Sequence, residues 1–114
     1  MQCHRLGYIY WKMGQQDEAR KLFDQSLDFD QEKLVQGNEL WLIPFDMAAV
    51  HAIQDNKEEA YKWLQKAIDA GWRFYKIGLK DPRLENLQND DRFQEMMAEV
   101  KAMVDEMRKR VEKE

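Results

Sequence analysis

Residues 6–27 read LGYIYWKMGQQDEARKLFDQSL, and this stretch decides the fold class of the chain. Apolar side chains recur at helical spacing on both sides of Gly14, which predicts two successive helices with Gly14 ending the first. Asp17 falls in the first turn of the second helix, where a carboxylate suits the helix dipole. The expected inner faces are Leu6, Tyr10 and Met13 on the first helix, and Ala19, Leu22, Phe23, Ser26 and Leu27 on the second.

A second copy of the pattern follows 41 residues later and reads MAAVHAIQDNKEEAYKWLQKAI over residues 47–68. The copies align without a gap, and small residues recur at matched positions, where they let paired helices approach closely. Pro44 suits a helical first turn, Asp55-Asn56 makes the turn, and Gly71 ends the second helix. The expected inner faces are Met47, Ala48, His51 and Ala52 on the first helix, and Ala60, Trp63, Leu64, Ala67 and Ile68 on the second.

The first copy carries a Leu-Gly pair, a tyrosine, a small residue, a large apolar residue and a second small residue. This order resembles the tetratricopeptide repeat, and the residues that carry it are Leu6, Gly7, Tyr10, Ala19, Phe23 and Ser26. The resemblance implies an all-α fold, an α-α superhelix of two helical hairpins. Two features depart from the family: the spacing is 41 residues rather than about 34, and Gln31 and Trp72 stand where the family has a terminal proline.

The rest of the chain is divided by turn and cap signals. Gly37-Asn38 marks a turn in an insert between the copies, and the preceding helix either runs on or the insert adds a turn of its own. Asp81-Pro82 predicts a short helix to about Gln88, and a long final helix is expected from about Asp91. The expected division is repeat one (1–30), insert (31–42), repeat two (43–71), and a capping segment with a long final helix (72–114).

The stretch after the second copy resembles the segment that closes tetratricopeptide arrays in bacterial multidomain proteins. That likeness rests on Gly71-Trp72, Asp81-Pro82-Arg83-Leu84 and Asp90-Asp91-Arg92-Phe93. It implies that the chain is the carboxyl end of an array, and a first helix that starts almost at Met1 agrees with this. An apolar run is expected to cover the end of the stack, with a ligand site as the alternative: Trp72, Phe74, Tyr75, Ile77 and Leu79.

The net charge of −4, with no basic stripe, argues against a nucleic-acid partner. The densest basic run, residues 108–110, is surrounded by carboxylates and is expected to be a solvated helix face, with contact to an anionic partner as the alternative. A single cysteine, Cys3, leaves no internal disulfide and no cysteine-rich zinc site. No signal peptide and no apolar stretch of membrane-spanning length is present in the chain, so no membrane partner is predicted. The compartment stays unknown, with the cytoplasm slightly favoured.

No catalytic, cofactor-binding or metal-binding residues are predicted, and the chain is not expected to be an enzyme. His51 takes the inner position equivalent to Tyr10, where a packed and hydrogen-bonded histidine is the simplest interpretation. Glu58-Glu59 and Asp90-Asp91 are explained by the preference of helix starts for negative charge. No glycine-rich phosphate loop, nucleophile elbow or zinc spacing occurs.

The resemblance implies that the first helix of each hairpin lines a concave groove in which peptides dock. By position, the groove would hold His4, Tyr8, Trp11 and Lys12 from repeat one, and Phe45, Ala49 and Ala52 from repeat two. Tyr8 and Trp11 share one helix face and either form an aromatic platform for a partner or pack against a further repeat. Family members that clamp a carboxylate have asparagine where Tyr8 and Ala49 stand, so that activity is not expected.

The final helix carries an apolar stripe expected to pack on repeat two at its start and to overhang at its end. The stripe consists of Phe93, Met96, Val100, Met103 and Met107, widened by Val104 and Val111. Met103 and Met107 in the overhang could pair with a partner helix or with a second copy; otherwise the end is a charged tail.

Two functions follow from these observations. The first is a protein-interaction or scaffold module that binds a peptide or protein in the groove. The alternative is a regulatory or sensor segment at the carboxyl end of a larger signalling enzyme or transcription regulator.

Overall fold

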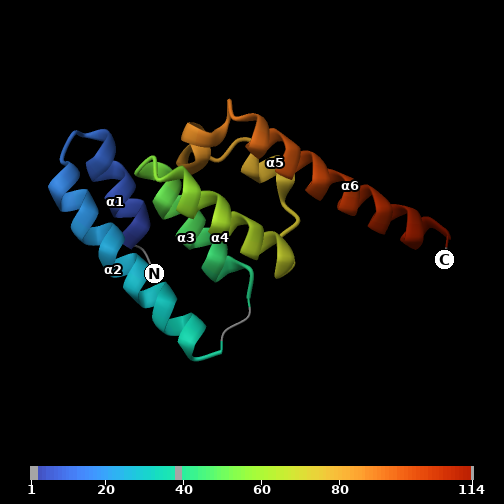
Figure 1. Ribbon diagram of the computed structural model, residues 1–114, viewed down its shortest axis with the longest axis horizontal. Helices are drawn as coiled ribbons and strands as arrows, with labels where there is room; N and C mark the ends of the chain where they lie inside the picture. Colours follow the sequence, from blue (N-terminus) through green and yellow to red (C-terminus); the bar gives the residue numbers. More distant parts are fainter. Residues whose placement is uncertain (1–2, 38–39, 114) are drawn as a thin grey trace.

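The computed structural model describes residues 3–37 and 40–113, with side chains described for 6–37 and 40–111. Within these residues all regular secondary structure is helical, without strands, as the sequence predicts (Figure 1). The helices are α1 (Cys3–Lys12), α2 (Gln16–Val35), α3 (Leu42–Ile53), α4 (Lys57–Asp69), α5 (Tyr75–Gly78), the 3-10 helix η1 (Pro82–Leu87) and α6 (Asp91–Lys113).

The two helical hairpins, α1–α2 and α3–α4, close with the same turn. Gly14 adopts a φ of 83°, and Asp55, at the equivalent position 41 residues later, adopts 60°. After each of them, the next backbone N–H donates across the turn over 2.9 Å, from Gln15 to Tyr10 and from Asn56 to His51. The aligned positions therefore have the same backbone conformation, which confirms the spacing read from the sequence.

The small and large residues predicted at matched inner positions are buried in both hairpins. Ala19 and Ala60 let the helices of each pair approach, and Phe23 and Leu64 fill the space beside them, all four with no exposed surface. Helix α3 is the most enclosed element, because it packs against α2, α4 and η1. Most of its side chains are consequently buried, and the core of the molecule is built around it.

Helix α2 continues through Val35, beyond residue 30, because nothing before Gly37 stops it. Of the two possibilities for the insert, the structure thus shows the helix running on. Gly37 has a φ of 88°, which suits the predicted turn, while Asn38 lies outside the described residues. Helix α3 begins at Leu42.

The capping segment contains an element that the sequence did not predict, the single-turn helix α5. The short helix after Asp81 is present, but as the 3-10 helix η1, with the Asp81 carboxylate accepting a hydrogen bond from the Arg83 N–H. The expected covering role of the apolar run was wrong in part: Trp72 is buried, Tyr75 is half-buried, and Phe74, Ile77 and Leu79 are exposed. Of these five residues, Trp72 is therefore the one buried in the core, and Tyr75 packs against the core from its edge.

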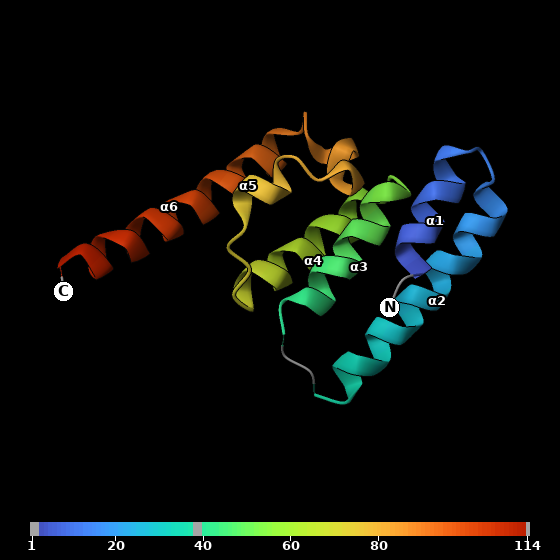
Figure 2. The ribbon, with the colours of Figure 1, turned by 180° about the vertical axis from the view of Figure 1, so that it is seen from behind.

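The predicted inner face of α1 was also wrong in part. Leu6 is 45% exposed and Met13 is 62% exposed, and Ile9 lies on the same side of the helix. The side of α1 that meets α2 is instead centred on Gly7, where an added Cβ would come within 2.7 Å of the Phe23 ring. Figure 2 shows α1 and α2 at one end of the row of helices, with α6 projecting from the other.

Candidate functional site

The structure places the predicted groove residues in two different environments. From α1, Tyr8 and Trp11 are half-buried and Lys12 is exposed at the surface. The side chain of His4 lies outside the described residues. From α3, Phe45, Ala49 and Ala52 are 4%, 0% and 0% exposed, respectively. A partner would have to displace a part of this chain to reach the α3 residues.

The part of the chain that covers this end of α3 is η1. Leu84 and Leu87 of η1 are completely buried and belong to the core that contains α3. The Asn86 Nδ2 donates a hydrogen bond of 2.8 Å to the backbone oxygen of Ala52, and so satisfies a carbonyl at the end of α3. Helix η1, which belongs to the capping segment, thus occupies the α3 half of the predicted groove.

Arg83 fixes η1 by three kinds of contact. Its guanidinium group binds the Asp81 carboxylate, with Nη2–Oδ2 at 2.8 Å and Nε–Oδ1 at 3.2 Å. It also lies 3.8 Å from the Asp46 carboxylate of α3 and 5.7 Å from the centre of the Phe45 ring. Sequence reasoning named Arg83 only as part of the motif of the closing segment and did not name Asn86, because nothing in their spacing shows which helix they will face.

The α1 half of the groove stays open and meets the edge of η1. Lys12 forms an ion pair with Glu85, and this carboxylate raises the pKa of the Lys12 ammonium group. The ammonium nitrogen lies 5.6 Å from the centre of the Tyr8 ring, a cation–π arrangement. The Trp11 ring packs against the Phe23 ring, with ring centres 6.0 Å apart.

Between α1 and η1 lies a cavity of about 120 Å³. Its lining combines two aromatic rings, two aliphatic side chains, charged groups and an amide: Tyr8, Trp11, Lys12, Ile53, Pro82, Arg83, Glu85 and Asn86. A volume of this size accommodates one side chain rather than a small molecule, since ligand pockets usually measure about 300–1,000 Å³.

His51 is only partly buried, and burial lowers the pKa of its imidazole. No hydrogen bond of its ring occurs within the described side chains, so the expected hydrogen-bonded histidine is not what the structure contains. Among residues 3–37 and 40–113, no cluster of three or more His, Cys, Asp or Glu residues is placed to hold a metal ion. No helix in that same part of the chain has the length and apolar character needed to cross a membrane.

A buried carboxyl group lies between the two hairpins, where α2 packs on α3. Asp30 is 2% exposed, and its Oδ2 has no hydrogen-bond partner in the described part of the chain. Burial, followed by the repulsion of the Asp46 carboxylate, raises the pKa of Asp30 to about 7. Arg83 forms an ion pair with Asp46 at 3.8 Å. The contact between the hairpins therefore favours a neutral Asp30.

This raised pKa predicts a dependence of stability on pH. Because the folded chain binds the Asp30 proton more tightly than the unfolded chain, the stabilisation is complete below the ordinary pKa of 3.8 and is lost as the pH rises through about 7. Asp30→Asn should raise the free energy of unfolding near pH 8 by about 1–2 kcal/mol, since it removes a buried unpaired charge.

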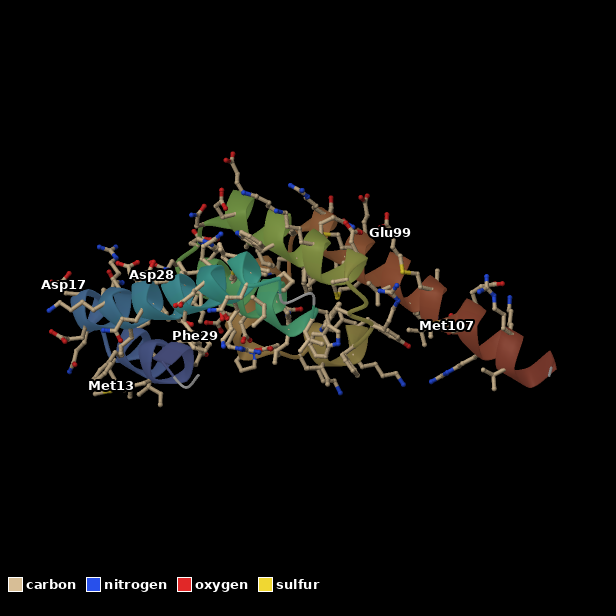
Figure 3. All side chains as sticks on the ribbon, turned by 90° about the horizontal axis from the view of Figure 1, so that it is seen from below. Met13, Asp17, Asp28, Phe29, Glu99 and Met107 are labelled. Carbon is tan, nitrogen blue, oxygen red and sulfur yellow. The ribbon has the colours of Figure 1, made fainter. Side chains whose placement is uncertain are left out.

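Urea unfolding near pH 5 and near pH 8 measures this effect, with Asp28→Asn on the exposed face of α2 as the control (Figure 3). The wild type and Asp28→Asn should lose stability between the two pH values, while Asp30→Asn should lose much less. An equal loss in all three proteins would contradict this role of Asp30.

Comparison with known proteins bears on the first hairpin. Residues 3–33, which contain α1 and most of α2, match the family model described as tetratricopeptide repeat. This match bears out the tetratricopeptide repeat read from residues 6–27, over the first hairpin that the model covers. No match was found among curated proteins or among solved structures. A place at the carboxyl end of a bacterial array stays a prediction.

Proposed function

We propose that this chain, a tetratricopeptide repeat protein by its first hairpin and hence a protein-interaction module at the coarse level, binds a peptide or protein partner on the open half of its groove. The surface proposed for the partner consists of Tyr8, Trp11 and Lys12 of α1, together with the facing edge of η1. No catalytic role is proposed, because repeats of this family generally act by binding.

The observation that carries this proposal is the pairing of half-exposed aromatic rings with polar groups around one hollow. Tyr8 and Trp11 offer apolar contact at little entropic cost, because Trp11 is already held by Phe23. Lys12, Glu85 and Asn86 offer charge and hydrogen bonds at the rim of the cavity. An extended peptide commonly uses such a combination, with one side chain inserted and its backbone along the rim.

The buried members of the predicted groove then have a supporting role. Phe45, Ala49 and Ala52 form the surface of α3 on which η1 and Trp72 pack, and η1 in turn supplies the second wall of the hollow. The groove proposed here is therefore shorter than one lined by the first helices of both hairpins.

This proposal is tested with a peptide selected for binding from a random library, with affinity measured by fluorescence anisotropy. Tyr8→Ala and Lys12→Ala should each weaken binding about tenfold, a typical loss for residues at the centre of an interface. The matched controls are Phe29→Ala and Lys33→Ala, another aromatic–lysine pair on α2, with the ammonium nitrogen 5.2 Å from the ring centre. Unchanged binding by both α1 variants, or equal losses in both pairs, would contradict the proposal.

One observation favours the second candidate, a regulatory or sensor segment of a larger protein. Leu6, Ile9 and Met13 form an exposed apolar stripe on α1, on the side where a further helical hairpin would stack. If this stripe packs on another part of a longer protein, α1 amides should exchange hydrogen more slowly there than in the isolated chain. Equal exchange rates in both would count against the second candidate.

A further inference from the structure

The final helix carries a regular apolar stripe that leaves the fold halfway along its length. Six of its apolar residues alternate at spacings of four and three, as in a coiled coil, with Met96 and Met103 of the predicted stripe beside them: Phe93, Met97, Val100, Val104, Met107 and Val111. Phe93, Met97 and Val100 are buried in the core, whereas Met107 is 53% exposed and Val111 is 72% exposed. Figure 3 shows Met107 on the part of α6 that projects beyond the other helices.

A hollow of about 700 Å³ lies along this projecting part. Its floor is apolar and its remaining members are two arginines: Val104, Met107 and Val111 with Arg73 and Arg108. Arg73 is held in place because its Nη1 donates to the backbone oxygens of Ile68 and Trp72, both over 2.8 Å. Its guanidinium group keeps further N–H donors for a ligand.

The stripe is flanked by basic residues on both sides. At 100° per residue, Arg108 and Lys101 lie on one side of it and Arg110 on the other, whereas Lys109 lies on the opposite face of the helix. Lys101 and Arg110 have exposed intrahelical partners at 3.2 and 4.0 Å, and such surface pairs contribute little. The charged residues that line the apolar floor are thus Arg73 and Arg108, while Asp105 and Glu106 pair with Lys101 and Arg110 farther around the helix.

We propose that the second half of α6, together with Arg73, binds an amphipathic helix of a protein partner whose apolar side chains are flanked by carboxylates. The apolar residues of that helix would cover Val104, Met107 and Val111, and its carboxylates would meet Arg73 and Arg108. This surface is distinct from the one proposed around Tyr8, so each can fail without the other.

Charge also distinguishes an acidic helix from two other possible partners, a second copy of the chain and an anionic membrane. A second copy of the chain would bring basic flank against basic flank, and only two turns of apolar surface would offset that repulsion. An anionic membrane would attract the arginines but repel Asp105, Glu106 and Glu112 of the same segment. An acidic helix can place its carboxylates opposite Arg73 and Arg108 alone, because Asp105, Glu106 and Glu112 lie farther from the stripe around the helix than Arg108 does. The small contact area predicts weak, reversible binding.

The test uses two synthetic helical peptides of about 20 residues, long enough to form helix on binding. Both carry leucine at the stripe positions; one has glutamate and the other lysine at the flanking positions. The acidic peptide should bind the full chain at least about tenfold more tightly than the basic one, and the preference should weaken at high salt. Arg108→Glu should remove most of the preference, whereas Lys109→Glu, the same charge change on the opposite face, should leave it intact.

Several outcomes would overturn the proposal. These are equal binding of the two peptides, no binding of either, and equal effects of Arg108→Glu and Lys109→Glu. Sedimentation of the chain as a dimer that Met107→Glu dissociates would assign the surface to a second copy. Tighter binding to vesicles of phosphatidylserine and phosphatidylcholine than to the acidic peptide would assign it to a membrane.

Discussion

Replacement of Trp72 by alanine is expected to lower the free energy of unfolding by about 3–5 kcal/mol, the usual cost of removing a large buried aromatic ring. Trp72 is 1% exposed, and its ring centre lies 5.1 Å from that of Phe45. The backbone at Gly78 comes so close that an added Cβ would lie 2.8 Å from the indole. Alanine would leave a cavity where α3, α5 and the start of α6 meet.

Urea unfolding measures this effect, and Ile77→Ala is the control because Ile77 belongs to α5 but is 59% exposed. The control should change stability by no more than about 0.5 kcal/mol, as is usual for surface positions. A loss below about 1 kcal/mol for Trp72→Ala would mean that the capping segment does not depend on this ring.

The second large effect is expected at Gly7, where the first hairpin is most tightly packed. A Cβ at this position would lie 2.7 Å from Cε1 and 2.9 Å from Cδ1 of Phe23, and Phe23 has no exposed surface into which it could move. Gly7→Val should therefore destabilise the chain by about 3 kcal/mol, at the upper end of the range for overpacked cores. Helix α1 should separate from α2 first.

Leu6→Val is the matched control, since it places the same β-branched side chain on the exposed side of the same helix. Its cost should stay below about 1 kcal/mol, the range of helix propensities. Thermal unfolding followed by circular dichroism compares the two variants. If both variants unfold at the same temperature, the close contact between Gly7 and Phe23 is not what holds the first hairpin together.

The two hairpins could be predicted because their signals are local. Small and large residues at fixed spacing, such as Ala19 with Phe23 and Ala60 with Leu64, determine which faces meet. The turns at Gly14 and Asp55 need only a few neighbouring residues to form. The buried positions predicted for α4 were all confirmed for the same reason. The start of the long final helix at Asp91 could likewise be predicted from local capping signals.

The environment of the groove could not be predicted, because it depends on contacts between distant parts of the chain. The hydrogen bond from Asn86 to Ala52 joins residues 34 positions apart, and no spacing rule points to it. Phe45 and Ala49 have the composition of a groove floor whether a partner or the chain's own η1 covers them. Whether η1 or a partner covers these two residues depends on the path of the backbone after Trp72.

The apolar run after repeat two was difficult for a different reason. A four-residue helix such as α5 has no periodicity that could separate its buried side from its exposed side. Trp72, Phe74 and Ile77 are equally apolar in sequence, yet only the first is buried. Similarly, the apolar stripe of α1 was assigned to the core, because its spacing suits burial by this chain and burial by another equally well.

The most direct test of the proposed function is an amide chemical-shift map of the chain, recorded with the library-selected peptide. We expect the largest changes at Tyr8, Trp11 and Lys12 on α1 and at Asn86 on η1, with the indole N–H of Trp11 among them. Changes confined to α2 around Phe29, or to the projecting half of α6, would contradict binding on the open half of the groove.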